Sequence, residues 1–285
     1  MIRRCFKISK YLPEINVWLD VIWFALLLIM FLFWYVIHFV GNWLTGRAYK
    51  RFVKWEWPPH EEVIPPTPKI MHGIHVVGMI CLALSGLYIR FPFVYGLRDA
   101  MRYLHYTCGV IVTINFISRL VYAFNVDKNE FILRWHEIKA MPVVLMYYLF
   151  IKSEKPHLAK YNPMQKMTYS MMFPIPLALM VYTGFAMLFP TPLLFWATPF
   201  VGEATALAWT RVIHYCLCML LIMFTLIHVY LSITEGLPGF LDFFGIVPIT
   251  HVEHVPHAEH EHAEIHSEGH EIKGHGIKSE HGEVE

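Results

Sequence analysis

Residues 211–230 read "RVIHYCLCMLLIMFTLIHVY", an almost wholly apolar stretch that contains two histidines, His214 and His228. About 20 mainly apolar residues in a helix cross the hydrocarbon core of a bilayer, which is roughly 30 Å thick. A polar side chain at membrane depth is costly and usually marks a pathway, a partner or a cofactor. The stretch therefore predicts a membrane-spanning helix whose two imidazoles have a function.

The rest of the chain has the composition of a membrane protein. Of its 285 residues, 56% are hydrophobic and only 16% are charged, which is more apolar surface than a soluble domain of this size buries. The net charge is +1, and no basic patch interleaved with aromatic residues suggests a nucleic-acid partner. The five cysteines are scattered without a CxxC pair, so we interpret them as packing residues rather than as a disulfide, zinc or iron–sulfur framework.

Five stretches approach spanning length: 17–40, 71–89, 105–124, 171–189 and 207–233. The first lacks the small-residue cleavage site of a removable signal peptide, so we keep it as a true span. A sixth apolar run, 141–151, is too short to cross and is expected to lie at the membrane interface. The predicted fold class is an all-α integral membrane protein, with a four-helix transmembrane bundle and an extra N-terminal transmembrane helix.

Four segments follow from this pattern. They are the N-terminal transmembrane helix (1–45), a Pro-rich cytoplasmic linker (46–69), the four-helix domain (70–245) and a His-rich tail (246–285). The tail contains nine of the 18 histidines among Glu, Gly and Lys, a composition typical of disorder. Its histidines are interpreted either as weak ligands of divalent metals or as part of a solubilising low-complexity segment.

The distribution of Lys and Arg predicts the orientation of the spans. These residues concentrate in the loops 47–69 and 128–166, and residues 190–206 contain none. Because positive loops stay inside, the first two loops are expected in the cytoplasm of a bacterium or archaeon and the third outside its cytoplasmic (inner) membrane. This scheme puts the basic N-terminus "MIRRCFKISK" outside, against the same tendency, so the topology of the first span stays open.

Four histidines lie near the ends of the predicted spans and fall into two pairs. His72 and His228 are at the inner level, and His105 and His214 are at the outer level. Fourteen residues separate His214 from His228, so both lie on one helix face about 21 Å apart along the axis. Two imidazoles at one depth suit the axial positions of a b-type haem, whereas zinc or copper takes three or four clustered ligands. The pattern predicts two b haems, with His75 as an alternative to His72.

Two further residues repeat the fourteen-residue step. Gly86 follows His72 at this distance and lies at the outer level, where a missing side chain lets the outer porphyrin approach. Arg119 follows His105 at the same distance and lies at the inner level, where it can pair with a propionate. The competing interpretations are a helix-packing glycine and an interfacial anchor arginine.

Four motifs resemble the core helices of a known family. They are "KIMHGIHVVGMICLALSGLYI", "MRYLHYTCGVIVTINFISRLVYAF", "YNPMQKMTYSMMFPIPLALMVYTGF" and "WTRVIHYCLCMLLIMFTLIHVYLSI". In order and spacing, over residues 67–234, they are similar to the di-haem cytochrome b subunits of respiratory NiFe hydrogenases and formate dehydrogenases. The resemblance implies the same histidine pairs, His72 with His228 and His105 with His214.

The resemblance also implies a quinone site beside the inner haem, for menaquinone or ubiquinone, with Asn162 and Gln165 as polar ligands. It implies partners on the outer face: an iron–sulfur or cytochrome electron-transfer subunit and a catalytic subunit. We therefore expect a subunit of an oxidoreductase complex that is not catalytic alone and passes electrons between that partner and the quinone. The alternatives are a quinol-oxidising subunit of a thiosulfate-reductase or multihaem-cytochrome complex, and a divalent-metal transporter without redox function.

Overall fold

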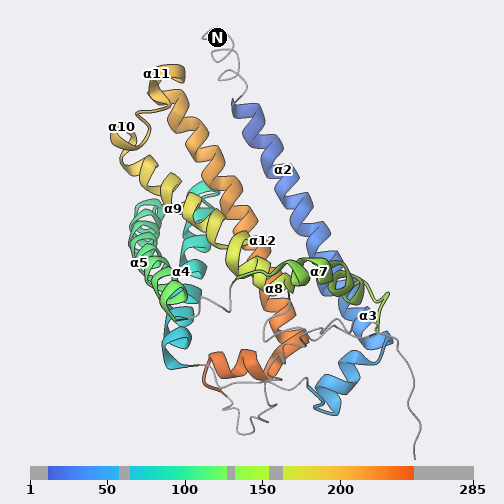
Figure 1. Cartoon of the computed structure of the whole chain (residues 1–285). Helices are drawn as coiled ribbons and strands as arrows, with labels where there is room; N and C mark the ends of the chain where they lie inside the picture. The colour runs from blue at the N-terminus through green and yellow to red at the C-terminus, as the bar shows by residue number, and fades with distance from the viewer. Residues whose placement is uncertain (1–11, 58–64, 127–131, 154–162, 247–285) are drawn as a thin grey trace, which may run out of the picture. The chain divides into compact units, whose positions relative to one another are not determined.

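Five helices are long and apolar enough to cross a membrane, in agreement with the predicted fold class. The computed structural model describes residues 12–57, 65–126, 132–153 and 163–246, and every regular element among them is helical (Figure 1). The candidate spans are Glu14–Leu44, Pro66–Arg90, Arg98–Asn125, Pro163–Leu188 and Glu203–Phe243. Asn162 and the His-rich tail from His251 onward lie outside the described residues.

The first span is continuous but changes its helical winding on the way. It comprises α2 (Leu12–Phe31), the π-helix η1 (Leu32–His38) and α3 (Phe39–Leu44), and a second π-helix, η2 (Tyr49–Val53), follows. Asp20 in α2 forms an ion pair of 2.7 Å with Arg90 at the end of the second span. The N-terminal part of the first span therefore lies at the same level as the C-terminal end of the second, the level that the loop charges predict to be outside.

The other four spans pack as two helix pairs. Helix α4 (Pro66–Arg90) lies along α5 (Arg98–Asn125), and α9 (Pro174–Leu188) lies along α12 (Glu203–Phe243). A Cβ atom on Gly78 would come within 2.4 Å of Val112 Cγ2, so glycine is what allows α4 and α5 to approach. Val112, Leu177 and Leu221 form a buried apolar cluster that joins α5, α9 and α12.

Helix α12 continues through a kink that the hydropathy pattern does not predict. Pro238 has no N–H to donate to the carbonyl of Thr234 four residues earlier, and Gly236 departs from helical geometry. The Arg51 guanidinium, from η2, donates to that carbonyl at 2.8 Å instead. The N-terminal segment thus satisfies the backbone group that the proline leaves open.

Most of the predicted interfacial run lies in helix α7 (Trp135–Tyr148), which packs on α8 (Pro163–Met167). The π-helix η3 (Thr168–Met172) follows α8. Glu137 in α7 is almost fully buried and forms an ion pair of 2.6 Å with Lys166 in α8. Burial raises the pKa of Glu137, but hydrogen bonds from the Arg134 N–H and the Lys166 ammonium outweigh it and hold the pKa below its ordinary value. The carboxylate therefore stays ionised and ties the two helices together.

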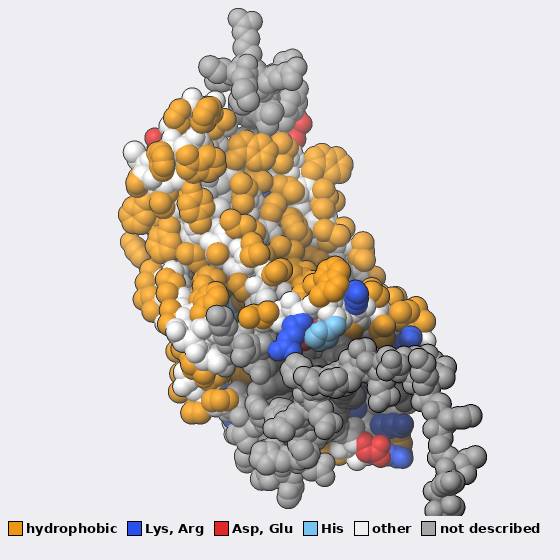
Figure 2. Space-filling model, viewed as in Figure 1, with side chains coloured by type: hydrophobic (Ala, Val, Ile, Leu, Met, Phe, Trp, Pro, Cys, Tyr) orange, Lys and Arg blue, Asp and Glu red, His pale blue; other side chains and the backbone are white. Residues whose placement is uncertain are grey.

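Two one-turn helices, α10 (Pro190–Leu193) and α11 (Thr198–Val201), lie in the connection between α9 and α12. On the face shown in Figure 2, hydrophobic side chains cover most of the described surface, and the visible Lys and Arg side chains gather toward its lower end. This separation is what a protein needs to place one band in lipid and its charged groups at an interface.

Candidate functional site

One large cavity lies between the helix pairs, and all four predicted histidines line it. Its volume is about 2040 Å³, whereas a site for one small ligand usually measures roughly 300–1,000 Å³. The cavity has room for more than one cofactor, and the helices that line it include α4, α5, α9 and α12.

The outer histidines face each other across this cavity. The ring centres of His105 and His214 are 6.3 Å apart. A metal–imidazole bond is about 2 Å long, so two imidazoles on opposite sides of one metal ion have ring centres about 6 Å apart. The spacing fits a planar macrocycle held between the two rings, as in a haem with two axial histidines.

The far side of each outer ring is held by a hydroxyl group. Ser85 Oγ lies 2.9 Å from His105 Nδ1, and Thr183 Oγ1 lies 2.9 Å from His214 Nδ1. Ser85 and Thr183 are buried, and neither is among the cavity-lining residues, whereas both histidines are. Each imidazole therefore stands between a hydroxyl group behind it and the cavity in front.

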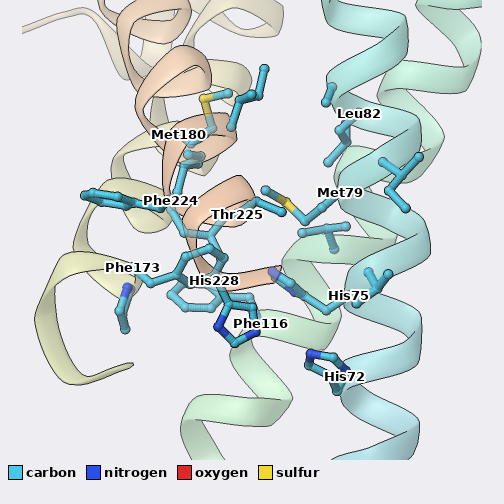
Figure 3. A pocket seen from close by; sticks show the side chains of 18 of the residues that line it. His72, His75, Met79, Leu82, Phe116, Phe173, Met180, Phe224, Thr225 and His228 are labelled. Carbon is cyan, nitrogen blue, oxygen red and sulfur yellow. The ribbon is translucent and has the colours of Figure 1, made fainter. Parts of the chain in front are cut away.

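The inner histidines are arranged in the same way but have fewer polar neighbours. His72 on α4 and His228 on α12 have ring centres 6.5 Å apart, and they project into a common space with His75 (Figure 3). Nδ1 of His72 and Nε2 of His75 are buried without a hydrogen-bond partner in the part of the chain that the structure describes. Nδ1 of His75 lies 3.5 Å from Asn115 Nδ2, and the His75 ring packs against Phe173, with ring centres 5.5 Å apart. His72 is therefore the histidine of α4 whose ring lies against His228.

The remaining predicted site residues have different positions. Gly86 lines the cavity next to His105, whose Cε1 would lie 3.1 Å from a Cβ atom at this position. Arg119 lines the cavity on α5, with its guanidinium 5.3 Å from the Tyr122 ring centre. Gln165 in α8 also lines the cavity, while Asn162 is outside the described residues.

The structure adds a buried polar cluster that the sequence analysis missed. Arg51 donates to Glu235 at 2.7 Å and to the Tyr147 hydroxyl at 2.7 Å, and all three residues line the cavity. Burial, followed by the charge of Glu235, raises the pKa of Tyr147. Arg51 and Glu235 are 184 positions apart, so no local pattern joins them.

The hydroxyl groups beside the outer histidines were also missed, although a local signal exists. Ser85 precedes Gly86 and Thr183 precedes Gly184, so each hydroxyl-bearing residue is followed by a cavity-lining glycine. A Cβ atom on Gly184 would lie 3.4 Å from His214 Cε1. The repeated hydroxyl–glycine dipeptide is the pattern that could have identified both positions.

Comparison with known proteins identifies a family over most of the part of the chain that forms the cavity. The family model described as prokaryotic cytochrome b561 matches residues 63–240. The matched region contains all four histidines and begins after the first transmembrane helix. No solved structure matches the chain.

Curated relatives carry a more specific description. A probable Ni/Fe-hydrogenase B-type cytochrome subunit of Azotobacter vinelandii is 23% identical over 199 residues, which cover 59% of this chain and 78% of that protein. The subunit of the same description from Cupriavidus necator is 22% identical and covers 60% and 78%. That from Rhizobium leguminosarum bv. viciae is 28% identical over 140 residues, 42% of this chain and 56% of the relative.

The family match extends over more than half of the chain, and the five apolar helices agree with it. A b-type cytochrome carries haem b and transfers electrons. The chain belongs to the prokaryotic cytochrome b561 family and is a multi-pass membrane cytochrome that binds haem b.

Proposed function

We propose that this cytochrome carries electrons through two b haems, between a hydrogenase-type partner at the outer face of the cytoplasmic membrane and a quinone at the inner end of the bundle. The observation that supports it most is the presence of two histidine pairs in one cavity, with ring centres 6.3 Å and 6.5 Å apart. His105 with His214 would hold the outer haem, and His72 with His228 would hold the inner one. Bound haem iron supplies the redox chemistry by alternating between its ferric and ferrous forms.

The chain separates the two levels with apolar side chains. Val112, Leu177 and Leu221 are buried between the helices, and Met79, Leu82, Phe116, Phe173 and Met180 pack against them. His214 and His228 are fourteen residues apart on α12, about 21 Å along a helix axis. These side chains give the cavity an apolar lining between the two levels.

Arginines are placed at both ends of the cavity. Arg102 and Arg211 each precede an outer histidine by three residues, about one helical turn, and both line the cavity. Arg119 lines it on α5, fourteen residues after His105 and therefore toward the inner end. We assign Arg102 and Arg211 to the carboxylates of the outer haem and Arg119 to those of the inner haem, since Arg pairs well with carboxylate.

The quinone site is proposed at the inner end because polar groups gather there. Gln165, Tyr147, Arg51 and Glu235 line the cavity on the side of His72 and His228. Amide, hydroxyl and guanidinium groups can donate to the carbonyl oxygens of a quinone. Reduction of a quinone to a quinol takes two electrons and two protons, and at this end the protons come from the cytoplasm. Asn162 keeps the role that the family resemblance implies for it, and menaquinone and ubiquinone both fit this chemistry.

The descriptions of the relatives support the proposed partner. The curated proteins that share this core are described as subunits of Ni/Fe hydrogenases, so we propose a catalytic subunit and an iron–sulfur or cytochrome electron-transfer subunit at the outer face. The chain itself supplies the membrane path and the quinone site.

Selective removal of one ligand tests the two-haem assignment. His214→Ala should lose the outer haem and keep the inner one, and His228→Ala should do the reverse, each leaving half of the wild-type haem in the purified protein. His136→Ala is the matched control, because His136 is exposed on α7 and does not line the cavity. Loss of both haems to the same extent in both ligand variants would contradict the pairing.

A further inference from the structure

The two outer histidines have the same environment, although they belong to different helix pairs. On α4, Ser85 lies behind His105 of α5, and on α9, Thr183 lies behind His214 of α12, each at 2.9 Å from Nδ1. A glycine that follows each hydroxyl-bearing residue leaves room for the ring. The repetition on two independent pairs of helices indicates a shared requirement of the outer site.

The direction of these hydrogen bonds follows from the single proton of each hydroxyl group. Ser85 Oγ lies 2.6 Å from the carbonyl oxygen of Cys81, and Thr183 Oγ1 lies 2.8 Å from that of Leu179, so each hydroxyl donates to the carbonyl four residues earlier. The hydroxyl oxygen is then an acceptor toward the imidazole, and Nδ1 is the donor. In this tautomer Nε2 carries the lone pair, which is the form of histidine that binds a metal.

The hydrogen bond also changes the electron-donating strength of the ring. An imidazole that donates its second N–H to an acceptor is a more basic ligand. A more basic axial ligand stabilises ferric over ferrous iron and so lowers the reduction potential.

The inner pair lacks an equivalent arrangement. Among the described residues, Nδ1 of His72 is buried without a hydrogen-bond partner. The ring of His228 lies beside those of His72 and Tyr169, and no hydroxyl group of the described residues is hydrogen-bonded to it. The hydroxyl acceptors therefore distinguish the outer level from the inner level.

Resting on the two-haem function proposed above, we propose that Ser85 and Thr183 are positioning residues that lock His105 and His214 in the Nδ1–H tautomer and hold the outer haem at a lower potential than the inner one. Electron transfer from the outer level to the inner level is then downhill. The direction of flow is from the outer partner toward the quinone.

Redox titration of the purified full-length protein tests the inference. Ser85→Ala and Thr183→Val each remove one acceptor, and loss of a hydrogen bond of ordinary strength should raise the ferrous-to-ferric ratio of the outer haem about threefold at a fixed applied potential. The double variant should reach about tenfold, which is about 59 mV for a one-electron couple. The potentials are read from the absorption and electron paramagnetic resonance spectra and assigned to a level with the His214→Ala and His228→Ala proteins.

Matched controls remove hydroxyl groups that form the same backbone bond elsewhere. Ser118→Ala on α5 and Thr210→Val on α12 each delete a donor to the carbonyl four residues earlier, and neither residue lines the cavity. Both controls should keep the two wild-type potentials. Ser85→Thr and Thr183→Ser retain the hydroxyl and should keep both the haem and its potential, even where Ser85→Ala or Thr183→Val loses the outer haem.

The outcomes separate the inference from the function on which it rests. A wild-type protein without haem, or with one haem, overturns the proposed function and the inference with it. Two bound haems whose potentials do not change in the double variant, or change equally at both levels, overturn the inference alone. An outer haem whose wild-type potential lies above that of the inner haem overturns it as well.

Discussion

Substitution of Gly86 by alanine is expected to weaken binding of the outer haem specifically. A Cβ atom at Gly86 would lie 3.1 Å from His105 Cε1, which is shorter than the ordinary contact range of 3.4–4 Å. The ring would have to retreat by a few tenths of an ångström. The ring is held in place because its Nδ1 is hydrogen-bonded to Ser85, the residue directly before Gly86.

The size of the effect follows from comparison with two other glycines. Gly184 has the corresponding place beside His214, but its Cβ atom would lie at 3.4 Å, an ordinary contact, and a Cβ atom on Gly73 meets nothing within 4 Å. All three are helical, so each alanine variant gains a similar helix propensity of up to about 1 kcal/mol. Overpacking by one methyl group typically costs about 1–3 kcal/mol, a factor of about 5–150 in affinity, and only Gly86→Ala should show it.

The assay measures the rate at which each purified variant releases haem to an excess of a haem-scavenging apoprotein. Gly86→Ala should lose one haem much faster than wild type while the second is retained, Gly73→Ala should match wild type, and Gly184→Ala should lie at or close to it. Equal release rates in the Gly86→Ala and Gly73→Ala proteins would refute the position of the His105 ring against Gly86.

Three further predictions concern the inner end and the interfacial helices. His72→Ala should remove one haem, while His75→Ala should keep both, because it is the His72 ring that lies 6.5 Å from His228; a haem assay showing the opposite pattern would make His75 the ligand. Arg51→Met should lower the melting temperature of the detergent-solubilised protein, since removal of one member of a buried ion pair costs about 3–5 kcal/mol. Pro238→Ala should recover part of this loss by supplying an N–H to the Thr234 carbonyl, and unchanged melting of Arg51→Met would be evidence against the role of the pair. Glu137→Gln should lower the melting temperature at neutral pH but make it less sensitive to acid. Burial raises the pKa of the Glu137 carboxyl, but the hydrogen bonds from Arg134 and Lys166 lower it by more, so the net pKa lies below its ordinary value. The carboxylate therefore stabilises the fold fully above the ordinary carboxyl pKa, and this stabilisation is lost as the pH falls through the lower pKa of the folded protein. A variant whose melting follows wild type at every pH would contradict this.

The spans could be predicted because hydropathy and helix length are local properties. Each of the five predicted stretches lies in or largely overlaps an observed helical span. The last was predicted to end at residue 233, near Gly236 and Pro238, whereas α12 continues to Phe243. At the kink the guanidinium of Arg51, from a distant part of the chain, donates to the Thr234 carbonyl in place of the missing backbone donor.

The approach of the histidines could also be predicted. The order of the spans and their alternating direction put His72 at the level of His228, and His105 at the level of His214. The sequence ranks His72 ahead of His75 because Gly86 follows His72 by fourteen residues. The 6.5 Å between the ring centres of His72 and His228 supports that ranking. The hydroxyl–glycine dipeptides could have marked Ser85 and Thr183 as candidates, but not the histidine that each one contacts. Ser85 is 20 residues from its partner His105, and Thr183 is 31 residues from His214, so only the packing of neighbouring helices reveals these contacts.

The central claim, two b haems held by two histidine pairs, is tested most directly by the haem content of the purified full-length protein. The measurement combines a dithionite-reduced minus oxidised absorption spectrum with a pyridine haemochrome assay on a known amount of chain. We predict two haems per chain, with the spectrum of six-coordinate b-type haem at both levels. A content of one haem, none, or a spectrum of five-coordinate iron would contradict the assignment of both histidine pairs.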